Sequence, residues 1–260
     1  MRNKKEKKNK KVKLILIIIR IVSLLVILGC IAVIIYRALN LDKSKKVIDN
    51  INSEIEINDK PITIEGQTTN IIDTNIESLK QKNKDTVGFI KVNGTNISYP
   101  VLQSSDNEYY LRHSFDNTYS QAGWIYMDYR NDSTLKDRNT IIYGHNMLNN
   151  TMFSELTKML NNSFFDLSDN NYISLCIENK STLWKIFSIY VTNPDTYYMS
   201  INFSSKSNYS EFLNNIKNKS FYNFNENISN ENRILTLSTC TNLNTKRLVI
   251  HAKLVYEENN

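Results

Sequence analysis

From residue 87 onward, apolar positions alternate with polar ones in short runs that turn-forming residues separate. Alternation over four to eight residues is typical of β-strands that are buried on one face. The runs cover residues 87–92, 97–103, 124–129, 139–145, 172–176, 181–192, 234–240 and 247–256. Eight strands and few helices predict a mainly β fold built as a closed or nearly closed barrel, because closure removes exposed sheet edges.

Three stretches predict short helices at the periphery. Residues 74–77 match a capping box and introduce a short apolar stripe. Apolar residues recur at helical spacing over 152–160 and again over 209–216, where Asn208 is the expected N-cap. We expect these helices to pack against the barrel.

The first 72 residues follow a different pattern. Residues 14–36 are almost entirely apolar and long enough to span a bilayer, and eight lysine and arginine residues precede them. By the positive-inside rule, the N-terminus is expected to stay in the cytoplasm. A cleavable signal peptide is the alternative, but the apolar run exceeds the usual length and no small-residue cleavage site follows it.

This pattern predicts a basic cytoplasmic tail over 1–13, a transmembrane anchor over 14–36, a polar stalk over 37–72 and the folded domain over 73–260. The protein is expected in the cell membrane as a single-pass protein with its folded domain outside. Ten lysine and arginine residues and one glutamate give residues 1–37 a charge of +9, so the remaining 223 residues sum to −3. The folded part therefore lacks the positive charge that nucleic-acid binding needs.

Three functional groups lie at the ends of predicted strands. Cys240 ends one run, His145 ends another, and Arg247 begins the last run seven residues after Cys240. Two antiparallel strands would hold the thiol and the guanidinium side by side. Acyl transfer through a thioester needs a thiolate, a proton donor for the leaving amine, and positive hydrogen-bond donors for the developing oxyanion. Cys240, His145 and Arg247 fit these roles in that order.

The other cysteines and histidines predict no further site. Cys30 lies in the apolar span, and Cys176 has the pattern of a small buried residue. His113 is expected at the surface or in packing, and His251 alternates onto the outer face of the last strand. No cysteine and histidine spacing matches a zinc site and no glycine-rich loop would cradle a phosphate, so neither a metal nor a cofactor is expected.

The residues around these groups resemble the sortase family, the cysteine transpeptidases of Gram-positive cell surfaces. Residues 236–240 (Thr-Leu-Ser-Thr-Cys), Arg247 and residues 143–147 (Tyr-Gly-His-Asn-Met) carry the resemblance. It extends through residues 87–90, 94–101 and 127–131 and covers roughly 75–256. Ser238, Met147, and the helices expected near 152 and over 208–218 resemble class B in particular.

The resemblance implies an eight-stranded sortase-like β-barrel and a specific reaction. Such an enzyme cleaves a C-terminal sorting signal of the Asn-Pro-x-Thr-Asn/Gly type through a thioester, here on Cys240. It passes the surface protein to an amine of a peptidoglycan precursor similar to lipid II. His145 would serve as the general acid and base, Arg247 would stabilise the oxyanion or the substrate, and Ser238 and Thr239 would contact the substrate.

Two features depart from the family, and alternatives stay open. The seven-residue spacing from Cys240 to Arg247 is shorter than in several class B members, and Asn242 stands where some members carry an acid. Among enzymes, the alternatives are a pilin-joining sortase and a thiol endopeptidase. In another class, the alternative is an inactive, surface-tethered binding module, against which the intact set of cysteine, histidine and arginine argues.

Overall fold

The computed structural model describes residues 2–194, 196–241 and 245–259. The chain divides into two compact units, Met1–Lys43 and Ser44–Asn260. Helix α1 (Arg2–Glu54) forms the first unit and contributes its last residues to the second. One segment of α1, Lys13–Tyr36, is long and apolar enough to cross a membrane, with a mean hydropathy of 3.1. This segment coincides with the expected anchor, and a membrane location stays a prediction.

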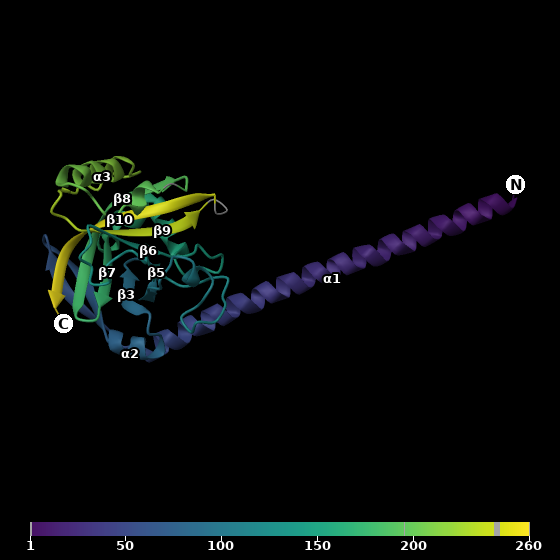
Figure 1. Ribbon diagram of the computed structural model, residues 1–260, viewed down its shortest axis with the longest axis horizontal. Coiled ribbons are helices and arrows are strands. Elements are labelled where there is room, and N and C mark those ends of the chain that lie inside the picture. The colour runs from purple at the N-terminus through teal and green to yellow at the C-terminus, as the bar shows by residue number, and fades with distance from the viewer. Residues whose placement is uncertain (1, 195, 242–244, 260) are drawn as a thin grey trace. The chain divides into compact units, whose positions relative to one another are not determined.

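Eight strands of the second unit form a closed barrel in the order β10-β8-β7-β3-β4-β5-β6-β9 (Figure 1). They are β3 (Thr86–Val92), β4 (Ser98–Leu102), β5 (Tyr126–Met127), β6 (Asn139–Tyr143), β7 (Tyr172–Ile177), β8 (Lys180–Thr192), β9 (Ile234–Thr241) and β10 (Lys246–Asn259). Each falls on one of the eight alternating runs. The predicted fold class, a mainly β barrel with peripheral helices, is confirmed.

The helices lie close to the predicted places, but their caps differ. Helix α2 (Ile76–Lys82) starts after Asn75, whose side chain accepts a hydrogen bond from the Ser78 amide, so Thr74 is not the cap. Helix α3 (Lys206–Asn218) starts before the expected N-cap Asn208, because the Ser205 hydroxyl caps an earlier turn.

The remaining helical segments are 3-10 turns. The stretch expected as a helix over 152–160 forms the 3-10 segment η2 (Ser154–Leu160). The others are η1 (Tyr109–Leu111), η3 (Asn162–Asp166), η4 (Ser168–Asn171) and η5 (Tyr197–Met199). Of these, η1 and η5 contribute residues to the pocket described below.

The polar stalk expected over 37–72 is corrected for residues 44–72, which belong to the folded unit. Strands β1 (Ile57–Ile64) and β2 (Gln67–Thr74) form an antiparallel hairpin. Its turn is Glu65-Gly66, and both residues have positive φ, as a tight hairpin turn requires. Ile71 and Ile72 are fully buried. The segment looks polar in sequence because most positions of β1 face solvent.

His251 lies on the outer face of β10, as expected, but that face is not exposed. Tyr190, Phe187 and Phe212 surround the imidazole, which has no solvent exposure. Helix α3 supplies Phe212 and covers this side of the barrel (Figure 1). Apolar side chains therefore fill the inside of the barrel and also the space between its outer face and α3.

Candidate active site

Strand pairing brings the three predicted groups to one end of the barrel. Strands β6 and β9 run parallel with Tyr143 opposite Ser238, so His145 and Cys240 each follow two residues later. Strands β9 and β10 run antiparallel, and Cys240 lies directly opposite Arg247. The prediction that β9 and β10 hold Cys240 and Arg247 side by side is confirmed by this strand register.

All three groups line one pocket of about 290 Å³. The predicted substrate contacts Ser238 and Thr239 line it as well. The other lining residues were not predicted as site residues, and they are Asn107, Leu111, Tyr126, Tyr143, Gly144, Pro194, Thr196, Tyr198 and Met199. His113, His251, Cys30 and Cys176 are not among the lining residues.

His145 is half-buried and its ring is held by the backbone. Its Nε2 atom lies 3.0 Å from the Leu111 carbonyl oxygen. Because a carbonyl can only accept, Nε2 carries the proton, and Nδ1 is the proton acceptor of the neutral ring. Burial lowers the pKa of His145, the hydrogen bond to Leu111 opposes this shift, and the charges of Arg112 and Arg247 add to it. The imidazole is therefore neutral at neutral pH and can take a proton.

Cys240 is half-buried and is the second-last residue of β9. Arg247 is also half-buried, and its Nη1 atom lies 3.4 Å from the Lys246 carbonyl oxygen, a long contact. Among the described residues, no carboxylate forms an ion pair with Arg247. Its guanidinium is thus a positive donor group at the pocket, beside the strand position that carries the thiol.

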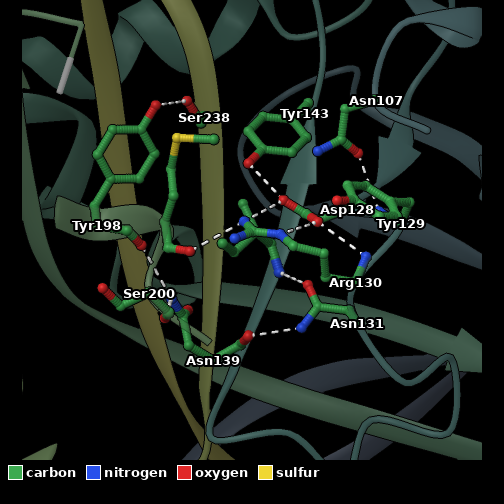
Figure 2. Close-up of polar contacts among 12 residues, drawn as sticks. Asn107, Asp128, Tyr129, Arg130, Asn131, Asn139, Tyr143, Tyr198, Ser200 and Ser238 are labelled. Carbon is green, nitrogen blue, oxygen red and sulfur yellow. Dashed lines mark hydrogen bonds and ion pairs between the residues drawn. The ribbon is translucent and has the colours of Figure 1, made fainter. Parts of the chain in front are cut away.

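Ser238 and Thr239 differ in how their hydroxyl groups are used. The Ser238 hydroxyl lies 3.0 Å from the Tyr198 hydroxyl and joins β9 to η5 (Figure 2). Thr239 is 2% exposed, and its Oγ1 atom has no hydrogen-bond partner within the described part of the chain. Both residues line the pocket, and a role of either in binding substrate stays a prediction. Asn242 lies outside the described residues.

Most residues of the pocket walls carry no sequence signal. Tyr198 and Met199 come from the connection between β8 and α3, and Asn107 and Leu111 come from the connection between β4 and β5. Both connections lack alternation, so no periodic pattern marks which side chains turn inward. Tyr143 could have been found, since it is the last residue of β6 and stands two residues before His145, and alternate residues of an extended chain point the same way.

Comparison with known proteins agrees with this geometry. The family profile described as "Sortase domain" matches residues 90–255. Sortase B of Listeria monocytogenes is 38% identical over 199 residues, which are 74% of this chain and 80% of that protein.

Solved structures give the same result. Sortase B from Bacillus anthracis in complex with AAEK1 has a TM-score of 0.69 and 35% identity, covering 84% of this chain and 98% of that one. The Staphylococcus aureus sortase B-substrate complex has a TM-score of 0.65 and 38% identity, covering 69% and 84%. A sortase B complexed with triglycine matches with the same values. The chain therefore belongs to the sortase family of cysteine transpeptidases and, within it, to class B.

Proposed function

We propose that this protein is a membrane-anchored sortase that cleaves a C-terminal sorting signal of the Asn-Pro-x-Thr-Asn/Gly type after the threonine. It transfers the resulting acyl group to an amine of a cell-wall precursor. The observation that carries this proposal is the shared pocket of Cys240, His145 and Arg247. The similarity to a sortase B with bound substrate supports a peptide as the first substrate.

The first half of the reaction forms a thioester. The neutral imidazole of His145 takes the proton of the Cys240 thiol as the sulfur attacks the threonine carbonyl carbon. The carbonyl oxygen gains negative charge, and the Arg247 guanidinium stabilises it. The C–N bond then breaks, and the imidazolium of His145 gives its proton to the leaving amine. The acyl group is now bound to the sulfur.

The second half transfers the acyl group. An acceptor amine attacks the thioester carbonyl and gives its proton to His145. The C–S bond breaks, and the Cys240 thiolate regains a proton from the imidazolium. The similarity to a sortase B complexed with triglycine supports an amine at the end of a short peptide as the acceptor. Water in the same position would yield hydrolysis, so competition between amine and water separates a transpeptidase from an endopeptidase.

The N-terminal segment supports the proposed location. Residues 14–36 lie in the apolar part of α1, and eight lysine and arginine residues precede them. Positive charge before a span favours a cytoplasmic N-terminus, which would put the barrel on the outer side of the membrane. There the barrel can reach both surface proteins and cell-wall precursors.

The test measures cleavage and transfer together. The full-length protein in detergent is incubated with a set of peptides that vary the Asn-Pro-x-Thr-Asn/Gly signal, with increasing triglycine. We expect a ligated product that grows with triglycine while the hydrolysed product falls. Cys240→Ala should yield neither product, and the matched variant Cys30→Ala in the apolar span should behave as wild type. Hydrolysis that triglycine does not change would identify an endopeptidase, and cleavage by Cys240→Ala would overturn the assignment of the nucleophile.

A further inference from the structure

Asp128 is a fully buried carboxylate beside the pocket, and it does not line the pocket. It follows β5 directly, and donors from two residues converge on it (Figure 2). Arg130 donates from Nε to Oδ1 at 2.9 Å, from Nη2 to Oδ2 at 2.8 Å and from its backbone amide to Oδ1 at 3.0 Å. The Tyr143 hydroxyl donates to Oδ2 at 2.9 Å.

These bonds keep the buried group charged. Burial by itself would raise the pKa of Asp128, but the hydrogen bonds from Arg130 and Tyr143 outweigh burial and lower it. A buried carboxylate without such donors would be strongly destabilising. The guanidinium suits this place because its planar fork meets both carboxylate oxygens at once.

The contacts of Asp128 and Arg130 lead to two different parts of the pocket lining. Tyr143 lines the pocket itself and stands two residues before His145 on β6. On the other side, Arg130 Nη2 also donates to the Met199 carbonyl oxygen at 3.1 Å. Tyr198 and Met199, which we call the η5 wall, line the pocket from the connection between β8 and α3. The buried Asp128 and its partner Arg130 therefore join β6 to the η5 wall.

Two side chains of the barrel also bond the η5 wall. The Asn139 side chain donates to the carbonyl oxygens of Tyr198 at 3.0 Å and Ser200 at 2.9 Å (Figure 2). The Tyr198 hydroxyl meets the Ser238 hydroxyl. Arg130 adds a bond to the Met199 carbonyl oxygen, which lies between the two carbonyls that Asn139 holds. Loss of this bond would loosen the backbone at Met199 while its neighbours stay attached.

We propose that Asp128 and Arg130 are positioning residues that fix the η5 wall and Tyr143, and so set the affinity of the pocket for the sorting peptide. This inference rests on the proposed function. Neither side chain touches the reacting atoms, so their removal should weaken peptide binding and leave the chemistry of Cys240 intact.

The test replaces Arg130 by lysine in the full-length protein in detergent. Lysine keeps the charge but offers one ammonium point, which cannot hold both carboxylate oxygens and the Met199 carbonyl. We expect KM for the peptide to rise roughly ten-fold or more, as the loss of a charge-assisted hydrogen bond implies. The value of kcat and the rate of Cys240 alkylation by iodoacetamide should stay within about two-fold, since neither depends on the wall.

Arg233 provides a matched control. Like Arg130, it donates to a backbone carbonyl and to a carboxylate. The acceptors are the Leu135 carbonyl oxygen at 2.8 Å and the Glu257 carboxylate at 2.7 Å. It precedes β9, at the end of the strand opposite Cys240, and it does not line the pocket. Arg233→Lys should leave KM, kcat and alkylation unchanged. Tyr143→Phe, which removes only the hydroxyl bonded to Asp128, decides the matter if Arg130→Lys does not fold.

Hydrogen exchange of residues 196–201 gives a readout that needs no turnover. Arg130→Lys should speed this exchange, and Arg233→Lys should not. If wild type turns over no sorting peptide, the proposed function fails while the exchange result still tests the wall. Folded Arg130→Lys and Tyr143→Phe with wild-type KM and exchange would refute the positioning role. A fall in kcat with slower alkylation at unchanged KM would equally refute it, because the pair would then act through Cys240.

Discussion

The folded domain should lose stability in mild acid, because the imidazole of His251 stays neutral while it is buried and takes up a proton only in the unfolded chain. Two hydrogen bonds fix the neutral ring. The Thr236 hydroxyl donates its proton to Asn139 Oδ1 at 2.6 Å, so it accepts from His251 Nδ1 at 2.8 Å. The Tyr190 hydroxyl lies 3.0 Å from Nε2 and donates to it. A second proton on Nε2 would leave two donors facing each other in a site without water access.

The size of this loss of stability follows from the shift in the pKa of His251. Burial, with a smaller effect from the charge of Lys219, lowers the pKa of His251 to about 3. In the unfolded chain the imidazole titrates near its ordinary value of ~6.5. Between these two pH values the unfolded state binds one more proton than the folded state, so the free energy of unfolding falls as the pH falls. The slope is about 1.4 kcal/mol per pH unit, which gives a loss of ~2 kcal/mol between pH 7 and pH 5.

The assay compares wild type with His251→Gln, since glutamine is polar but does not titrate. The unit Ser44–Asn260, which has its own core, is unfolded in urea at pH 7 and at pH 5. All other titrating groups are shared, so the difference between the two pH effects isolates His251. Wild type should lose ~2 kcal/mol more than the variant. Equal losses in the two proteins would refute the reasoning.

Three further predictions concern the pocket. If the guanidinium stabilises the oxyanion, Arg247→Lys should slow acylation at saturating peptide by roughly 100-fold to 1,000-fold. A mutant that acylates at the wild-type rate but binds peptide weakly would show that Arg247 binds the substrate instead. Because the pKa of His145 is lowered, the acid limb of the pH profile of kcat/KM should lie below about pH 6.5, and a limb above that value would contradict the burial argument. Gly144→Ala would place a Cβ atom 2.5 Å from Ile125 Cδ1 and 2.8 Å from ring atoms of Phe153. This overpacking should lower the free energy of unfolding in urea by about 1–3 kcal/mol, and it should reduce activity by displacing the neighbouring His145. An unchanged urea midpoint would show that the site relaxes around the added methyl group.

The barrel could be predicted because each strand carries its own alternation, which burial on one face imposes. The hairpin β1–β2 could not, because Ile71 and Ile72 find their partners only once the barrel exists. Local capping rules also left a choice. Ser205 and Asn208 are both good caps, and the structure selects the one that lengthens α3 by a turn.

Only part of the candidate site could be predicted from the sequence. Cys240, His145 and Arg247 could be predicted because a functional side chain at a strand end stands out against an apolar run. The η5 wall and the pair of Asp128 and Arg130 depend on contacts between segments about 70 residues apart, such as the bond from Arg130 to Met199. Sequence spacing carries no information about such contacts.

The most direct test of the central claim is the mass of the enzyme during turnover. The full-length protein is mixed rapidly with an intact sorting peptide that it is known to cleave, quenched in acid and digested for mass spectrometry. The proposed mechanism predicts a fragment containing Cys240 that has gained the mass of the peptide up to its threonine, and that loses it when triglycine is added before the quench. Turnover without any acyl group on Cys240, or with the acyl group on another residue, would contradict the claim that this cysteine is the nucleophile.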